Sequence, residues 1–246
     1  MTSPLSPALR PGLHVVRRDD HHLQVGVDPP WRVVVPDRPG VRRLLGALAS
    51  GRAALPETDT EHRALLALAE AGMLSEPPRR PRHTVAVHAP GDAGDEAVRV
   101  LRSAGCEVGA GPVALVLSPG ELVRADADTQ LRDGRPHLLM AGGVHGWTLG
   151  PFVVPGASAC LRCVDAHRGE QDPRRALVVE QLAGLPAAPD DPALASLAVA
   201  WAVRDLLTHL DGGQPSTWSA TIEIGPDLRP HRQVWSRHPH CGCSWS

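Results

Sequence analysis

Hydrophobic and polar positions alternate along the first part of the chain before the spacing becomes helical. The stretches 13–19 and 23–28 place apolar side chains at every second position, which is typical of half-buried β-strands. The Val-rich stretch 31–36 predicts a third strand, and Pro36 closes it because proline cannot donate a backbone hydrogen bond. Since the three stretches follow one another closely, we expect them to pair as one small sheet.

Two amphipathic helices are predicted after these strands. The first is marked by apolar side chains at helical spacing, namely Val41, Leu44, Leu45 and Leu48. The second begins at a capping-box pattern formed by Thr58 and Glu61 and ends near Gly72. We therefore expect residues 1–76 to form a small winged-helix-like module, and the Pro- and Arg-rich stretch 77–82 to be a linker.

From residue 83 onward, continuous apolar runs alternate with helical patterns. The apolar runs are typical of buried parallel strands, and they span 83–89, 112–119 and 136–143. An irregular Pro-rich region is expected after the first cysteine pair, and then a long helix that starts at Asp191 and Pro192. This alternation indicates an α/β fold with a reduced, Rossmann-like sheet, so we assign residues 83–246 to a second domain.

Four of the five cysteines lie in two close pairs that are far apart in the sequence. Cys160 and Cys163 have the C-x-x-C spacing, and Cys241 and Cys243 have the C-x-C spacing near the C-terminus. Two such pairs can supply the four thiolates that structural Zn²⁺ prefers in a tetrahedron. We therefore predict a structural zinc site that ties the C-terminal segment to the loop after the sheet.

Two other interpretations of the cysteines remain open. A C-x-x-C pair at a helix N-terminus can act in redox chemistry if its thiolate is accessible. His167, His238 and His240 lie close enough in the sequence to replace one thiolate as a zinc ligand, although loop histidines are common. The fifth cysteine, Cys106, is expected to be a small buried side chain.

Composition and charge limit the classes of function. The formal net charge is -2, so neither bulk nucleic-acid binding nor binding to an anionic membrane is indicated. No apolar stretch approaches the ~20 residues of a membrane span, and the N-terminal sequence has no signal-peptide pattern. We expect a cytoplasmic protein with reduced thiols. All 25 basic residues are arginine, so no mechanism that requires a lysine can run in this chain alone.

The sequence GPFVVPGASACLRCVDAHR, the long helix with Trp201 and the closing HPHCGC resemble the C-terminal part of ThiF/MoeB-type proteins, which are related to ubiquitin-activating enzymes. They are more closely similar to an actinobacterial branch of ThiF-like proteins that bind leader peptides or accompany cyclodehydratases in the biosynthesis of TOMMs, the thiazole/oxazole-modified microcins. The N-terminal module resembles the winged helix that precedes this domain in that branch, the RiPP recognition element, which binds ribosomal precursor peptides. The resemblance covers almost the whole chain.

The resemblance implies a peptide site on the N-terminal module. A leader peptide would add a strand to the edge of the third predicted strand, at Val33, Val34 and Val35. The basic side chains that would receive acidic groups of the peptide are Arg38, Arg42 and Arg43. An arginine face of this kind is often simply solvated, and this interpretation stays beside the functional one.

The resemblance also implies a nucleotide site, and here the pattern is incomplete. Superfamily members that adenylate a carboxylate use a glycine-rich turn, a ribose-binding acid, a lysine and an arginine at the phosphates, and an aspartate for Mg²⁺. In this chain Gly91 and Gly94 are a remnant of the turn, and Ala89 occupies the leading glycine position. Asp92 would repel a pyrophosphate. We interpret Gly91 and Gly94 as a vestigial cofactor site or a plain βα connection, and we expect no ATP.

These patterns favour a binding protein over an enzyme. We predict a non-catalytic scaffold that holds the leader region of a precursor peptide and presents it to a YcaO-type cyclodehydratase, the partner that the resemblance implies. The glycine-rich stretch 141–150, with His145 and Trp147, is expected to pack on a partner rather than to form a substrate pocket. A homodimer is a further expectation, because sheets of this superfamily often dimerise. Two alternatives remain: a ThiF-like ATP-dependent adenylyltransferase, and an orphan homologue that binds another protein.

Overall fold

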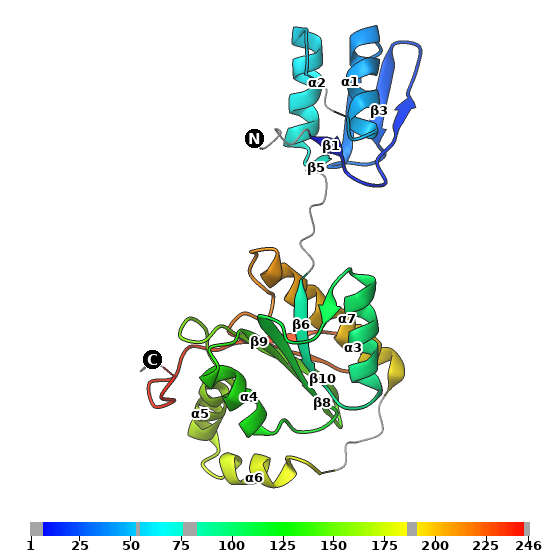
Figure 1. The fold of residues 1–246 in the computed structure, drawn as a ribbon. Coiled ribbons are helices and arrows are strands. Elements are labelled where there is room, and N and C mark those ends of the chain that lie inside the picture. Colours follow the sequence, from blue (N-terminus) through cyan, green and yellow to red (C-terminus); the bar gives the residue numbers. More distant parts are fainter. Residues whose placement is uncertain (1–6, 53–54, 76–82, 186–190, 244–246) are drawn as a thin grey trace. The chain divides into compact units, whose positions relative to one another are not determined.

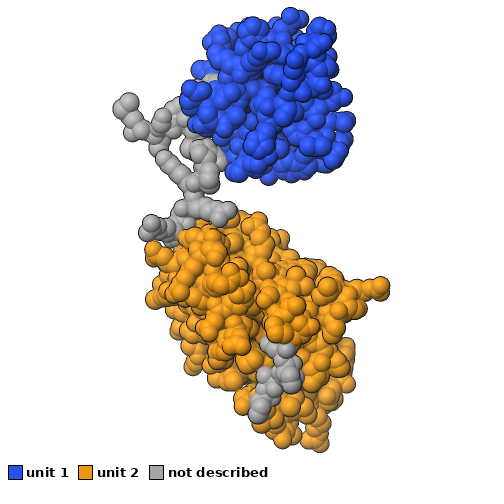
Figure 2. All heavy atoms as spheres, turned by 90° about the vertical axis from the view of Figure 1, so that its right-hand side faces the viewer, with its two compact units in different colours: residues 1–81 blue, residues 82–246 orange. Residues whose placement is uncertain are grey.

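The computed structural model of this chain describes residues 7–52, 55–75, 83–185 and 191–243. Contacts within the chain divide it into two compact units, residues 1–81 and residues 82–246, which Figure 2 shows in different colours. Each unit has a hydrophobic core of its own. The predicted domain boundary after residue 76 and the predicted linker 77–82 lie outside the described residues.

Unit 1, residues 1–81, consists of a small antiparallel sheet and two helices. The sheet has the order β2-β3-β4, and a separate short pairing joins β1 to β5. The strands are β1 (Ala8–Leu9), β2 (Val15–Arg17), β3 (His22–Gly26), β4 (Arg32–Pro36) and β5 (Leu74–Ser75), and the helices are α1 (Pro39–Ala49) and α2 (Asp59–Glu70). The three predicted strands and both predicted helices are present, and the winged-helix topology stays a prediction.

The core of unit 1 follows directly from the sequence pattern. Val33 and Val35 are buried, whereas Val34 between them is 41% exposed, because successive strand residues point to opposite faces. The apolar stripe of α1 is buried against the same core. The Thr58 hydroxyl accepts a hydrogen bond of 3.3 Å from the Glu61 N–H, so the predicted cap of α2 forms.

Unit 2, residues 82–246, is built on a 7-stranded mixed sheet with the order β12-β11-β10-β9-β8-β6-β7. The neighbours β7, β6, β8 and β9 pair parallel, whereas β9, β10, β11 and β12 pair antiparallel. The bounds are β6 (Thr84–His88), β7 (Glu107–Val108), β8 (Val113–Ser118), β9 (His137–Gly143), β10 (Gly146–Val153), β11 (Ala220–Ile224) and β12 (His231–Val234). The switch point of the parallel part lies between the carboxyl ends of β6 and β8.

Helices cover both faces of this sheet, as Figure 1 shows. Leu115 and Leu138 face α3 and α7, whereas their chain neighbours Val116 and Leu139 face α4 and α5. The helices of unit 2 are α3 (Asp92–Ser103), α4 (Arg124–Arg132), α5 (Leu161–Gln171), α6 (Arg175–Leu182) and α7 (Pro192–Leu210). The α/β prediction for this part of the chain is confirmed.

The irregular region predicted after the first cysteine pair is wrong where the helices α5 and α6 lie, and its residues 186–190 lie outside the described residues. Pro173 falls between the two helices, where it interrupts neither of them. The buried stripe of α5 is short, and it consists of Leu161, Cys163 and Val164. Hydrophobic spacing alone therefore gives little sign of this helix.

Helix α7 is the one described helix that is long and apolar enough, by length and composition, to cross a membrane. The Asp191 carboxylate caps it and accepts hydrogen bonds from the N–H groups of Ala193 and Leu194, as the sequence predicts. Its buried residues pack against the sheet and include Ala198, Ala202 and Leu206. Within the described residues it is a core helix of unit 2.

Candidate functional site

The four paired cysteines converge on one point of unit 2. Cys160 is the N-cap of α5 and Cys163 lies in its first turn, while Cys241 and Cys243 come from the segment after β12. The Sγ atoms of Cys160 and Cys163 are 3.7 Å apart, and Cys160–Cys241 and Cys163–Cys243 are both 3.4 Å apart. Tetrahedral Zn²⁺ with bonds of about 2.3 Å requires sulfur separations of about 3.8 Å. The four donors therefore fit a zinc ion with small adjustments.

The electrostatics of this cluster also favour a cation. Hydrogen bonding with Cys160 lowers the pKa of Cys163, while hydrogen bonding with Cys163 and burial raise the pKa of Cys160. Burial raises the pKa of Cys241 to about 11. Four thiolates at these separations repel one another, so they cannot all ionise unless a divalent ion lies between them. Both sulfurs of the C-x-x-C pair are buried, which disfavours the redox interpretation.

The neighbouring histidines surround the cysteine cluster and replace none of its members. The His238 N–H donates to the Cys163 Sγ at 3.3 Å, and the His238 ring lies 3.0 Å from the Glu170 carboxylate through Nε2. The His240 N–H donates to His238 Nδ1 at 3.2 Å. His167 Nε2 lies 3.1 Å from the Ser236 carbonyl oxygen. These bonds fix the segment after β12 against α5 and support the sulfurs from outside.

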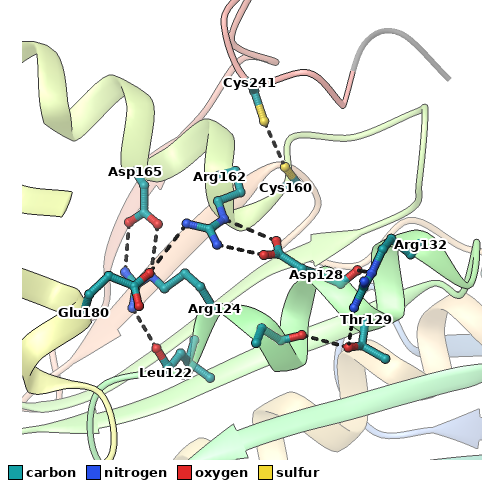
Figure 3. A network of polar contacts seen from close by, with 11 residues as sticks. Leu122, Arg124, Asp128, Thr129, Arg132, Cys160, Arg162, Asp165, Glu180 and Cys241 are labelled. Atoms are coloured by element: carbon teal, nitrogen blue, oxygen red, sulfur yellow. Dashed lines mark hydrogen bonds and ion pairs between the residues drawn. The ribbon is translucent and has the colours of Figure 1, made fainter. Parts of the chain in front are cut away.

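A network of ion pairs joins the cysteine end of α5 to α4 and α6, as Figure 3 shows. The Arg162 guanidinium lies 2.7 Å from Asp128 of α4 and 3.7 Å from Glu180 of α6. Arg124 is buried and lies 2.9 Å from Asp165 of α5. Burial opposes the charge on Arg124, but hydrogen bonds to Asp165 and then Glu121 outweigh it and raise the pKa of Arg124.

The crevice at the switch point is the place where the nucleotide site implied by the resemblance would lie. A cavity of about 600 Å³ opens at the carboxyl ends of β6 and β8, and His88, Ser118 and Gln130 are among its polar lining residues. No arginine lines it within the described residues. The first turn of α3 carries Asp92 and Asp95, whose charges oppose an anion at the helix N-terminus.

The backbone geometry explains why glycine stands at positions 91 and 94, and this explanation needs no nucleotide. Gly91 is the N-cap of α3 and has a φ of 77°, a conformation that other residues rarely adopt. A Cβ atom on Gly94 would lie 2.1 Å from the Ala89 carbonyl oxygen. The close approach of α3 to the end of β6 therefore requires a glycine there, which supports the interpretation as a βα connection.

In unit 1, β4 is an edge strand of the three-stranded sheet. The Asp37 N–H donates to the His21 carbonyl at 2.7 Å, and the register pairs Val35 with Leu23 and Val33 with Val25. Odd-numbered residues of β4 therefore point their backbone groups toward β3, and the even-numbered ones point theirs outward. The outward N–H groups are those of Arg32 and Val34, because Pro36 has none.

The predicted basic residues of unit 1 differ in whether they are already paired. Arg42 pairs with Asp37, and Arg43 lies 2.8 Å from Glu57. Arg38 is exposed and makes no ion pair within the described residues. Arg32, which sequence analysis missed, shares both properties and stands at the other end of β4. The two unpaired cations therefore flank the outward edge of this strand.

The glycine-rich stretch 141–150 lines a second cavity of unit 2. Trp147 is 2% exposed and belongs to the core, so its ring is not available to a partner. His145 lines a cavity together with four arginines that sequence analysis missed, namely Arg124, Arg168, Arg175 and Arg229. Nothing in the local sequence distinguishes these arginines from the others, because the four lie on separate segments of the chain.

No protein-family model and no curated protein sequence matches this chain. Solved structures do match it. The heterocyclase TruD superposes with a TM-score of 0.71 at 18% identity, over 98% of this chain and 43% of that protein. A heterocyclase in complex with substrate and cofactor gives 0.69 at 16% identity, over 97% of this chain and 39% of the other. E. coli MccB with AMPCPP and MccA superposes with a TM-score of 0.61 at 14% identity, over 98% of this chain and 99% of that protein. MccB is a microcin C7 biosynthetic enzyme.

At these identities the likeness establishes the fold. The chain spans about two fifths of the length of the two heterocyclases, and it spans MccB almost completely. Both kinds of protein combine the parts seen here, since nearly all of this chain superposes on each of them. The chain therefore shares its fold with MccB and with the matching part of the two heterocyclases.

Proposed function

We propose that this chain is a non-catalytic scaffold of peptide biosynthesis. Unit 1 binds the leader region of a ribosomally made precursor peptide, and the chain presents that peptide to a separate YcaO-type cyclodehydratase. Unit 2 supplies a rigid, zinc-stabilised support for this complex. The precursor peptide is acidic and binds in an extended conformation.

The observation that carries this proposal is the outward edge of β4. Val34 lies at the middle of the strand and points its N–H outward, where no described residue bonds it, and its side chain is partly exposed. Arg32 and Arg38 flank the strand without an ion pair among the described residues. An extended acidic peptide can satisfy these backbone groups and both cations at once, which is the mode of β-strand addition.

The comparison with TruD bears on the proposed partner. TruD is a heterocyclase, and this chain superposes on 43% of it. More than half of TruD lies outside the match, and we propose that a YcaO-type protein supplies the cyclisation. The substrate bound to the second heterocyclase and the MccA bound to MccB support a peptide as the shared ligand of such folds.

The absence of adenylation by this chain rests on the switch-point crevice. Its described lining holds no arginine, the chain holds no lysine, and Asp92 lies in the first turn of α3. The alternative is an ATP-dependent adenylyltransferase, and the observation in its favour is the almost complete overlap with MccB, which was solved with AMPCPP. Titration calorimetry with ATP and Mg²⁺ separates the two, because an adenylyltransferase binds ATP with micromolar affinity.

The peptide site is tested with the full-length protein and a fluorescent acidic peptide. Val34→Pro removes an outward N–H from β4 and should abolish binding, and Arg38→Gln should weaken it most at low salt. Val15→Pro is the matched control, because Val15 points its N–H outward from β2, the opposite edge of the same sheet. Equal losses in the two proline variants, or salt-independent binding, contradict the proposal. Gel filtration with light scattering tests the expected homodimer.

A further inference from the structure

Unit 2 contains a cavity of about 460 Å³ that is distinct from the switch-point crevice. It lies between α5 and the antiparallel part of the sheet, beside the hairpin of β9 and β10. The two cavities share Leu122 alone among their described lining residues. The side chains that matter for its chemistry are Arg168, Arg175, Arg229, Thr148, Thr221 and Glu223.

The charges around this cavity are unbalanced. Arg124 also lines it, but Glu121 and Asp165 neutralise that guanidinium through direct ion pairs. Over the whole described lining, four guanidinium groups face three carboxylates, and two of these carboxylates, Glu121 and Asp165, are already held by Arg124. The Arg168–Glu223 pair is long, at 3.3 Å, and the Glu223 side chain is 52% exposed. Positive charge therefore exceeds negative charge at the wall of the cavity.

Arg175 gives the clearest indication that this cavity suits an anion. Its Nε is buried and has no hydrogen-bond partner within the described residues, which is rare for a guanidinium because buried donors are normally satisfied. Burial lowers the pKa of the Arg168 guanidinium, and the nearby charge of Arg175 lowers it further. Arg229 makes no ion pair among the described residues. Two like charges held together beside an unsatisfied donor are relieved by an anion that binds between them.

We propose that this cavity binds an oxyanion, a phosphate or carboxylate group of a larger ligand, between Arg168 and Arg175. Guanidinium groups hold such anions through paired N–H donors. The Trp235 Nε1–H donates to Thr221 Oγ1 at 2.9 Å, so the Thr221 hydroxyl keeps its own hydrogen for the ligand. The site rests on unit 2 alone and does not depend on the peptide site of unit 1.

The experiment uses full-length protein and two probes, inorganic pyrophosphate and tetraglutamate. Titration calorimetry in sodium chloride of matched ionic strength should detect binding of at least one probe. Arg175→Gln keeps a polar side chain but removes the charge, and it should weaken binding about tenfold or more, because hydrogen bonds to charged groups are strong. Arg174→Gln is the matched control: Arg174 is the exposed neighbour, does not line the cavity, and should change binding less than about twofold.

Each outcome decides one point. Preference for pyrophosphate makes the ligand a phosphate, and preference for tetraglutamate makes it a carboxylate. Arg229→Gln repeats the test at an exposed residue in case Arg175→Gln does not fold. Val34→Pro should leave the binding of the probe unchanged. Loss of binding in that variant would assign the probe to unit 1 and overturn the site. Absence of binding by both probes, or equal effects of Arg174→Gln and Arg175→Gln, also overturns it.

Discussion

The cysteine end of unit 2 and its switch-point crevice are both places where this fold can hold a charged ligand, and they differ in what their residues offer. At the cysteine end, donors from two segments nearly eighty positions apart meet within 4.8 Å of one another, and the set suits one cation. At the crevice, the described residues provide space but no cation for an anionic ligand. A position in a fold becomes a site only where complementary side chains occupy it.

The same comparison extends to what surrounds each place. Ion pairs through Arg124 and Arg162 brace the cysteine end against α4 and α6. The crevice is instead shaped by a close approach of backbone, where Gly94 of α3 lies against Ala89. The region around the four cysteines is therefore held by ion pairs, and the crevice is shaped by the close packing of α3 on β6.

Loss of the metal should have the largest effect. Cys163→Ser should abolish stoichiometric zinc and lower the free energy of unfolding by more than about 3 kcal/mol, because structural zinc supplies on the order of 10 kcal/mol of apparent binding energy in small domains. Elemental analysis and urea unfolding followed by tryptophan fluorescence measure both quantities. Cys106→Ser is the control and should keep one zinc per chain with a much smaller loss. Purified protein without zinc, whose thiols titrate freely, would show that the cluster is not a metal site.

Removal of a buried ion-pair partner should come next. Asp165→Asn leaves the buried Arg124 short of a counter-charge and should cost about 3–5 kcal/mol in the free energy of unfolding. Asp128→Asn breaks the partly exposed pair with Arg162 and should cost about 0–1 kcal/mol. Urea unfolding of the two variants measures the contrast. Equal costs would mean that the network braces the cysteine end no better than ordinary surface charges do.

A smaller effect is expected at the crevice. Gly94→Ala should cost about 1–3 kcal/mol, because its Cβ would meet the Ala89 carbonyl and force α3 away from β6. Gly169→Ala is the matched helical control, since nothing lies within 4 Å of a Cβ there. It should stabilise the protein by about 0.5–1 kcal/mol. Thermal unfolding gives both values, and a neutral Gly94→Ala would remove the structural reason for this glycine.

The smallest effect should be that of ATP. Calorimetry with ATP and Mg²⁺ should give no tight binding, because the crevice opposes phosphates. Weak binding through the phosphates should disappear in Arg175→Gln and persist in Asp92→Asn. The reverse result would indicate that the crevice is a nucleotide site, and it would contradict the contrast drawn between the crevice and the cysteine end.

The sequence predicts most of this fold because its signals are local. Alternating Val residues mark β4, and the caps at Thr58 and Asp191 mark the starts of α2 and α7. The cysteine cluster is equally visible, since its ligand types and spacings are restrictive. Helices α5 and α6 escape prediction because their apolar stripes are short and their role depends on packing.

The arginine cavity could not be predicted, because its residues meet only in the folded sheet. Arg168 lies on α5, Arg175 begins α6 and Arg229 lies between β11 and β12. Each of them is an ordinary arginine in the sequence. The pairing of Arg42 and Arg43 with nearby acids was equally invisible, because salt bridges depend on side-chain positions that spacing does not determine.

The proline that ends β4 also bears on the solubility of the protein. An exposed strand edge is a template for fibril growth, since a second copy can pair with it. If two β4 strands paired antiparallel about Val34, each Arg32 would lie opposite the Pro36 of the other copy, which has no N–H to donate. Such a ribbon would lose hydrogen bonds at both ends and place an arginine at each of them. The edge therefore suits the proposed guest peptide better than it suits pairing with a second copy of the same chain.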